Sequence, residues 1–148
     1  MKVSLIELFE ETVRKYPQKV AVIDKDRDIS FSDLQKKSLW LASTLIALGI
    51  KQNRPVGVFL DKSIESVYAD LGILYAGDFY MNLDIKTPAE RIKNIIQLIE
   101  PAAIISTQAQ IKSIAAVIPD SVKLILLEEA DDTMTIDAPM LSDRRATL

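Results

Sequence analysis

The sequence predicts an α/β fold: a doubly wound, mostly parallel sheet with helices on both faces, preceded by an N-terminal helix and a β-hairpin. Short, nearly unbroken apolar runs alternate with segments of helical periodicity. Continuous apolar strands joined by helical crossovers require a parallel sheet covered on both faces, and right-handed crossovers make it doubly wound. At 49% apolar residues, the chain can bury a substantial core. The predicted parallel strands are residues 56–60, 79–83, 102–106 and 122–127.

The chain opens on a segment with strong helix signals. Ser4 and Glu7 form a capping box, in which each side chain can bond to the backbone amide of the other residue. Apolar residues follow at helical spacing as far as Pro17, which ends the helix. Two β-prone runs then flank the polar turn 25–28 and predict a hairpin. The two predicted hairpin strands are residues 20–24 and 29–31.

The next two predicted helices have clear boundaries. A second capping box, Ser32 with Gln35, predicts the start of a helix that Gly49 closes. The following helix begins near Ser63 and ends at Gly77. Glycine is favoured directly after a helix because it adopts the left-handed conformation without a Cβ penalty.

The strongest helix start lies after the second parallel strand. Thr87 is the expected N-cap, Pro88 the first helical residue and Glu90 the third. Pro101 ends this helix, and a fifth helix is predicted over 107–117. From residue 128 the sequence becomes polar and irregular, which predicts a loop or frayed end.

The composition excludes several classes of site. The chain has no Cys, which excludes disulfides, thiolate-bound metals and a thiol nucleophile. It has no His, which excludes a Ser-His-Asp triad and removes the commonest transition-metal ligand. A metal could bind only through oxygen, as Mg²⁺ or Ca²⁺ would. The four glycines are too far apart to build a phosphate-binding loop.

The charge and hydropathy pattern predicts a cytoplasmic protein. The net charge of −3 comes without a basic patch, so we expect no nucleic-acid partner. The N-terminus runs directly into an amphipathic, acid-containing helix rather than a signal peptide. The most apolar window, 39–50, is too short to span a bilayer, so we expect no membrane partner.

Three motifs occur in order along the chain. Ile29-Ser-Phe-Ser-Asp-Leu34, the string Leu74–Asp84 and the run Pro88-Ala-Glu-Arg-Ile92 resemble the opening motifs of the AMP-forming adenylating ligases. This family comprises acyl-CoA synthetases and the amino-acid adenylation domains of peptide synthetases, and the third motif favours the amino-acid branch. Tyr75 replaces the family's usual Lys, and Asn82 its usual Pro.

The resemblance implies an ATP- and Mg²⁺-dependent ligase that joins a carboxylate to AMP and then to a thiol of CoA or a carrier-protein pantetheine. In this branch of the family the carboxylate is expected to be an amino acid. It implies that residues 1–127 form the N-terminal α/β subdomain and that 128–148 is an irregular polar tail leading toward the phosphate loop. The family's phosphate loop and catalytic lysine have no match in this chain. We therefore assign no catalytic, cofactor-binding or metal residue and expect the chain to be inactive without the remainder of the enzyme.

Five features with functional potential have simpler structural interpretations. We expect Gly77 to end a helix, Tyr80 to pack its ring on a strand, and Asp84 to act in a loop or cap although it follows a parallel strand. Arg91 is expected on an outer helix face. The acidic run Glu128–Asp132 fits no EF-hand spacing and is expected to be solvated.

One alternative belongs to another functional class: a stand-alone, non-catalytic α/β binding or interaction module. A phospho-receiver domain would need an acidic pair after the first parallel strand, where this chain has Asp61 with Lys62. A dinucleotide-binding enzyme would need Gly-x-Gly-x-x-Gly after a strand, which is absent. If the sheet normally continues into a larger enzyme, the chain alone exposes an open strand edge, and we expect self-association.

Overall fold

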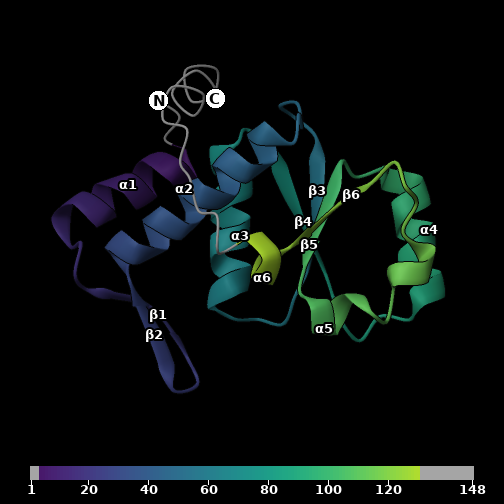
Figure 1. Ribbon diagram of the computed structural model, residues 1–148. Helices are drawn as coiled ribbons and strands as arrows, with labels where there is room; N and C mark the ends of the chain where they lie inside the picture. Colours follow the sequence, from purple (N-terminus) through teal and green to yellow (C-terminus); the bar gives the residue numbers. More distant parts are fainter. Residues whose placement is uncertain (1–3, 131–148) are drawn as a thin grey trace.

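The computed structural model describes residues 4–130 and has the predicted α/β architecture (Figure 1). Helix α1 (Leu5–Lys15) precedes an antiparallel hairpin of β1 (Val20–Asp24) and β2 (Arg27–Ser30). Helices and parallel strands then alternate. They are α2 (Phe31–Ala47), β3 (Pro55–Phe59), α3 (Ile64–Tyr75), β4 (Phe79–Leu83), α4 (Ala89–Ile99), β5 (Ala103–Ser106), α5 (Gln108–Ile111), the 3₁₀ turn η1 (Ala115–Val117), β6 (Lys123–Leu126) and α6 (Leu127–Ala130).

The four-stranded sheet has the order β4-β3-β5-β6, and all its strands are parallel. The chain enters at β3, moves outward to β4, and then returns past β3 to β5 and β6. The connection that follows β3 therefore runs toward one edge of the sheet, and the connection that follows β5 runs toward the other edge. This reversal of strand order is a topological switch point, as in other doubly wound sheets.

Helices cover both faces of the sheet and enclose two apolar cores (Figure 1). On one face Val56 and Val58 of β3 lie against residues of α1, α2 and α3. On the other face Phe59, the last residue of β3, packs with Ile92 and Ile96 of α4. Alternate residues of β3 thus point into different cores, which explains why the strand sequence is apolar throughout.

Helices α2 and α3 pack closely at Gly72. A Cβ atom added there would lie 2.8 Å from the carbonyl oxygen of Ser38 and 2.9 Å from the Cβ of Leu41. The same two helices bring the Trp40 and Tyr68 rings into an edge-on contact with 6.4 Å between centroids. Gly72 is therefore needed for close approach within a helix and not for a turn.

The two predicted helix-ending glycines are confirmed. Gly49 and Gly77 have φ values of +82° and +84°. After α3 the amide of Asp78 donates to the carbonyl of Ile73, and the amide of Gly77 donates to Leu74. An equivalent pair of bonds follows α2. Both ends are Schellman motifs, which satisfy carbonyl groups that the helix itself leaves unpaired.

Helix starts are only partly as predicted. Ser4 caps α1 as expected, and Ser63 caps α3, whose start was predicted near this residue; each side chain accepts a bond from an amide three residues on. The capping box predicted at Ser32 is wrong, because β2 passes directly into α2 and Ser30 accepts from the amide of Asp33. Thr87 is not an N-cap either: α4 begins after Pro88 without a side-chain cap.

The predicted helix over 107–117 is also wrong. The segment forms the short α5 and the separate η1, since Ile114 leaves the helical conformation with φ −127° and ψ 0°. Ile111 and Ile114 are both buried in the core on the α4 side of the sheet. Apolar residues three apart also share a face in 3₁₀ geometry, so their spacing could not distinguish one long helix from two short turns.

The hairpin is confirmed, with a tighter turn than predicted. β2 begins at Arg27, so Lys25 and Asp26 alone connect the strands. Lys25 has a φ of 58°, in the left-handed region that two-residue hairpin turns use.

Gly72→Ala tests the close packing of α2 and α3. In an exposed helix this change would stabilise the protein, because Ala has the higher helix propensity. Here we expect it to lower the free energy of unfolding by about 1–3 kcal/mol, the usual cost of overpacking. Urea unfolding followed by far-UV circular dichroism measures the change. An unchanged or increased stability would show that α2 and α3 can separate at no cost.

Candidate functional site

The carboxyl ends of β3 and β5 lie at the switch point, where ligands of open α/β sheets bind. A cavity of about 660 Å³ opens there. We call it the switch-point pocket, lined by the hairpin turn (24, 25 and 27), the segment after β3 (60–63 and 65) and the segment after β5 (107, 109 and 110). Three parts of the chain that are distant in sequence therefore meet at one edge of the sheet.

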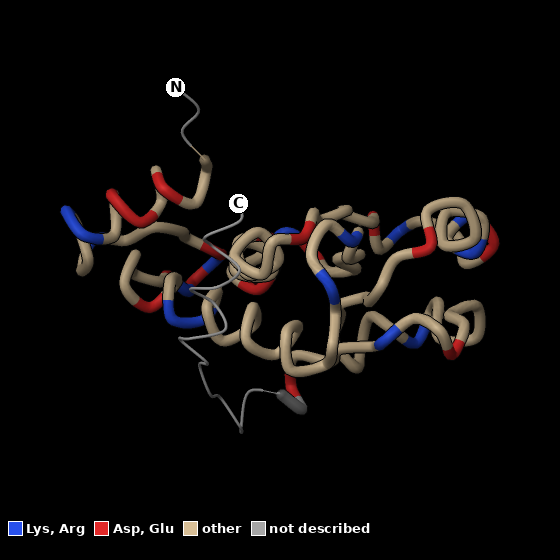
Figure 2. The backbone as a smooth tube through the Cα atoms, turned by 90° about the horizontal axis from the view of Figure 1, so that it is seen from above, with Lys and Arg blue, Asp and Glu red and all other residues tan. Residues whose placement is uncertain are grey.

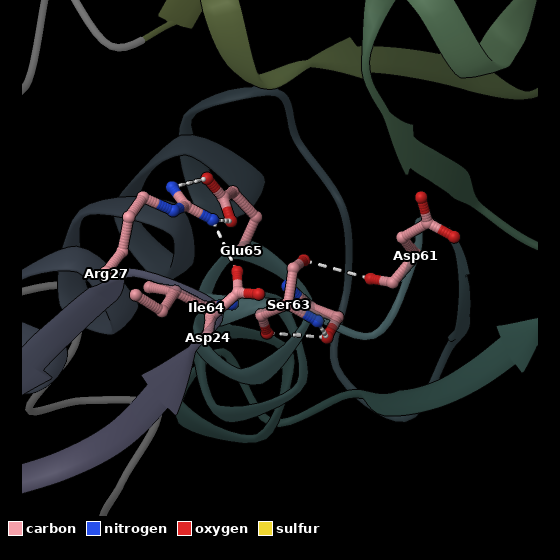
Figure 3. Close-up of polar contacts among 7 residues, drawn as sticks. Asp24, Arg27, Asp61, Ser63, Ile64 and Glu65 are labelled. Carbon is pink, nitrogen blue, oxygen red and sulfur yellow. Dashed lines mark hydrogen bonds and ion pairs between the residues drawn. The ribbon is translucent and has the colours of Figure 1, made fainter.

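An ion cluster of Asp24, Arg27 and Glu65 fastens the hairpin to α3 at this pocket (Figure 3). The Arg27 guanidinium bonds both carboxylate oxygens of Glu65, at 2.7 and 3.0 Å, and also donates to Asp24. The same oxygen of Asp24 accepts from the amide of Ile64 at 3.3 Å. Asp24 therefore places a negative charge at the N-terminus of α3, where the helix dipole favours one.

These contacts shift the ionisation of all three side chains. The hydrogen bond from Arg27 lowers the pKa of Asp24, and the Ile64 amide lowers it further. The Arg27 hydrogen bond also lowers the pKa of Glu65, and Glu65 and Asp24 together raise the pKa of Arg27. Each carboxylate is thus held in its charged form by its partner.

A second cavity, of about 520 Å³, lies between the ends of β3 and β4. Asp70 of α3 lines it and accepts a 3.3 Å bond from the side chain of Asn82 on β4. The other carboxylate oxygen of Asp70 is buried and has no hydrogen-bond partner among residues 4–130. Burial accordingly raises the pKa of Asp70, and the bond from Asn82 only partly offsets this.

The sequence-selected residues do not converge on one site. Gly77 ends α3, as predicted. Asp84 forms a turn after β4, where its side chain accepts from the amide of Lys86. Arg91 lies on the outer face of α4. Tyr80 is 40% exposed on the edge strand β4, so its predicted packing is wrong, whereas the ring of Tyr75 on α3 is fully buried.

Glu128, the first residue of the acidic run, is exposed as predicted, but it lies in helix α6 and not in the predicted irregular segment. Both carboxylate oxygens of Glu128 accept from the amide of Gln108, at 3.0 and 3.2 Å. This contact joins α6 to the first residue of α5. Residues 131 and 132, like the rest of the predicted polar tail to residue 148, lie outside the described part of the chain.

Sequence reasoning missed the ion cluster because its partners are far apart. Arg27 and Glu65 are separated by 38 positions, and neither belongs to a motif. A weak signal was present: Asp24 and Arg27 flank a two-residue turn with opposite charges. That signal gives the pairing within the hairpin but not the helix to which the hairpin is attached.

Other kinds of site find no support in the described residues. Between residues 4 and 130, no group of three or more acidic side chains comes close enough together to hold a metal ion. No helix in that range is long and apolar enough to cross a bilayer. Basic and acidic residues are interspersed along the described chain (Figure 2).

Known proteins share the sequence pattern and the fold of this chain. The AMP-binding enzyme family matches residues 9–145. The chain belongs to this family. It is 34% identical to tyrocidine synthase 1 of Brevibacillus parabrevis over 126 residues, which is 85% of this chain but 12% of that protein. The chain thus spans a small part of that relative's length.

Solved structures of adenylating enzymes share the fold. A benzoate CoA ligase from Burkholderia xenovorans superposes with a TM-score of 0.83 at 18% identity, over 93% of this chain and 30% of that one. An artificially fused adenylation-PCP di-domain, NpsA-ThdA from Klebsiella oxytoca, gives 0.78 at 17% identity, over 90% and 25%. The resemblance inferred from the three sequence motifs is therefore confirmed at the level of family and fold.

Replacing Arg27 tests the ion cluster. The lowered pKa values of Asp24 and Glu65 mean that their contribution to stability is present above their ordinary values of 3.8 and 4.5 and is lost as the pH falls through the lower folded-state values. We expect Arg27→Gln to lower the melting temperature at pH 7. The difference from the unmodified chain should shrink below pH ~4, as the carboxylates become protonated.

Lys15→Gln is the matched control. Lys15 forms an exposed ion pair with Glu11 one helical turn away, at 3.0 Å, and such pairs contribute little. Thermal melts from pH 3 to pH 7 compare the two variants. Equal decreases in melting temperature, or a difference for Arg27→Gln that does not depend on pH, would contradict a structural role for the cluster.

Proposed function

We propose that this chain forms the N-terminal α/β part of an ATP-dependent, AMP-forming ligase that activates a carboxylic acid as an acyl-adenylate. The observation that carries the proposal is the family match over residues 9–145, which includes all three motifs recognised in the sequence. In the proposed reaction, the substrate carboxylate attacks the α-phosphate of ATP, pyrophosphate leaves, and a thiol then takes the acyl group from AMP.

The proposed substrate is an amino acid. The motif Pro88–Ile92 resembles the amino-acid branch of the family, and the similarity to tyrocidine synthase 1 points the same way. The proposed acceptor is a carrier-protein pantetheine or CoA. A carrier protein is favoured by the likeness to NpsA-ThdA, whose adenylation domain is joined to a PCP.

The role proposed for this chain is that of a scaffold. Its motifs build a helix end, a strand and a turn: Gly77 closes α3, residues 79–83 form β4, and Asp84 binds the amide of Lys86. The sequence contains no glycine-rich phosphate loop. We therefore propose that ATP and Mg²⁺ are bound by the remainder of the enzyme. This chain provides part of the structural framework of that enzyme.

ATP–pyrophosphate exchange over a panel of amino acids and aryl acids tests the function. We expect no exchange above background with the 148-residue chain alone. We expect exchange with one or a few acids when the chain is joined to the polypeptide encoded directly after Leu148, if that region carries a Ser/Thr/Gly-rich loop with a Lys. Turnover by the chain alone would refute its assignment as a scaffold.

A stop codon directly after residue 148 would instead favour the stand-alone interaction module. In that case the chain would lack the loop and lysine on which the proposed reaction depends. Sequencing the gene beyond this point therefore separates the two functions before any assay is performed.

We also propose that the 148-residue chain on its own associates through strand β4. This edge strand carries Phe79 and Tyr80, which are 51% and 40% exposed. Its sequence, Phe-Tyr-Met-Asn-Leu, has no charge and no proline, the features that commonly prevent edge strands from pairing. Two copies could therefore pair their β4 edges without charge repulsion.

Sedimentation velocity over a range of concentrations tests this association. We expect the unmodified chain to become larger with concentration and Tyr80→Lys to remain a monomer, because a lysine on the edge opposes strand pairing. Leu98→Lys is the matched control, since Leu98 is 85% exposed on α4 and not on the edge. A monomer at every concentration, or an equal effect of both substitutions, would contradict the proposal.

A further inference from the structure

The switch-point pocket has the position and size of a ligand site. It lies outside the carboxyl ends of β3 and β5, where their connections diverge. Its volume of about 660 Å³ is within the range of pockets that hold small molecules. The pocket is not formed by the sequence motifs, because the motif residues Gly77, Tyr80 and Asp84 do not line it.

Most of the charge at the pocket is already neutralised. Arg27 pairs with Glu65 and Asp24, and Asp24 also accepts from the N-terminal amide of α3. The N-terminus of α3 is therefore occupied by a carboxylate of the protein itself. These groups form one wall of the pocket and are not free to bind a ligand.

Two lysines remain. Lys25 comes from the hairpin turn and Lys62 from the segment after β3, and both line the pocket. Neither ammonium group is in an ion pair or hydrogen bond within the described residues. The acidic residue left among the lining residues is Asp61, whose carboxylate points away from the ion cluster in Figure 3. The uncommitted side chains therefore carry two positive charges and one negative charge.

Polar groups on the opposite wall complete the chemistry. Thr107 and Gln110, at the end of β5 and in α5, both line the pocket. The backbone amide of Gln110 donates to the Thr107 hydroxyl at 3.3 Å, and this hydroxyl donates to the side-chain oxygen of Gln110 at 3.5 Å, which fixes this wall locally. The side-chain NH₂ group of Gln110 can donate to a ligand hydroxyl, and the Asp61 carboxylate can accept from one, whereas two ammonium groups are suited to a doubly charged anion.

We propose that the switch-point pocket binds a small phosphorylated molecule that carries hydroxyl groups. Lys25 and Lys62 bind the phosphate, and Asp61 and Gln110 face the hydroxyl groups. The hairpin, held by the ion cluster, keeps Lys25 over the pocket. This binding lies outside the adenylation reaction and can be measured without ATP or an acid substrate.

The experiment titrates ¹⁵N-labelled chain with inorganic phosphate, ribose 5-phosphate and ribose while amide shifts are recorded. We expect saturable shifts at Lys25, Lys62 and Thr107 with the two phosphates, and tighter binding of ribose 5-phosphate than of phosphate. The double variant Lys25→Gln, Lys62→Gln should weaken ribose 5-phosphate binding by about tenfold or more, because two charge-assisted contacts are lost. Ribose alone should bind weakly or not at all.

The control removes the same charge elsewhere. Lys93→Gln with Lys112→Gln changes two exposed lysines that do not line the pocket. An equal loss of affinity in this control would show general electrostatic attraction and overturn the site. Absent or non-saturable shifts at the pocket would overturn it too, as would binding retained by the Lys25→Gln, Lys62→Gln chain. Thermal melts establish that both double variants are folded before titration.

Discussion

Strand β3 has neighbours on every side, and the positions of the other elements follow from this. It pairs with β4 along one edge and β5 along the other, and its two faces lie in different apolar cores. Space on the α4 side is limited: a Cβ at Gly57 would lie 3.2 Å from Ile104 and 3.3 Å from Leu83. A central strand so enclosed fixes both neighbouring strands and the start of the loop at residue 60, which lines both cavities at the carboxyl edge.

The hairpin is attached to this framework in a different way. A two-stranded hairpin is marginally stable by itself and must be held by packing or by polar contacts. Ala21, Val22 and Ile29 are partly buried against the core on the α2–α3 side. At its turn, however, the hairpin is fastened by Arg27 between Asp24 and Glu65. The same cluster forms a wall of the switch-point pocket, so the structure of the hairpin and the shape of the pocket are coupled.

The departures from the family motifs have physical counterparts in the fold. Asn82 stands where the family has Pro, and its amide donates to Asp70 of the adjacent helix. The bond satisfies one oxygen of a half-buried carboxylate whose pKa is raised by burial. Tyr75 stands where the family has Lys, and its ring is fully buried, in an edge-on contact with Phe9. The motif is thus retained as a scaffold while single positions have been adapted to local packing.

The sequence by itself determined the class of fold, the four parallel strands and the glycine-ended helices, because these signals lie within a few residues of one another. The cap at Ser4 and the start of α3 near Ser63 were predicted for the same reason. Only the tertiary structure decided the direct passage from β2 into α2, the division of segment 107–117 and the exposure of Tyr80. The Arg27–Glu65 pairing and the pocket beside it also depend on where the backbone places distant segments. Local periodicity predicts which residues share one face of a helix or strand, but long-range packing decides what each of them contacts.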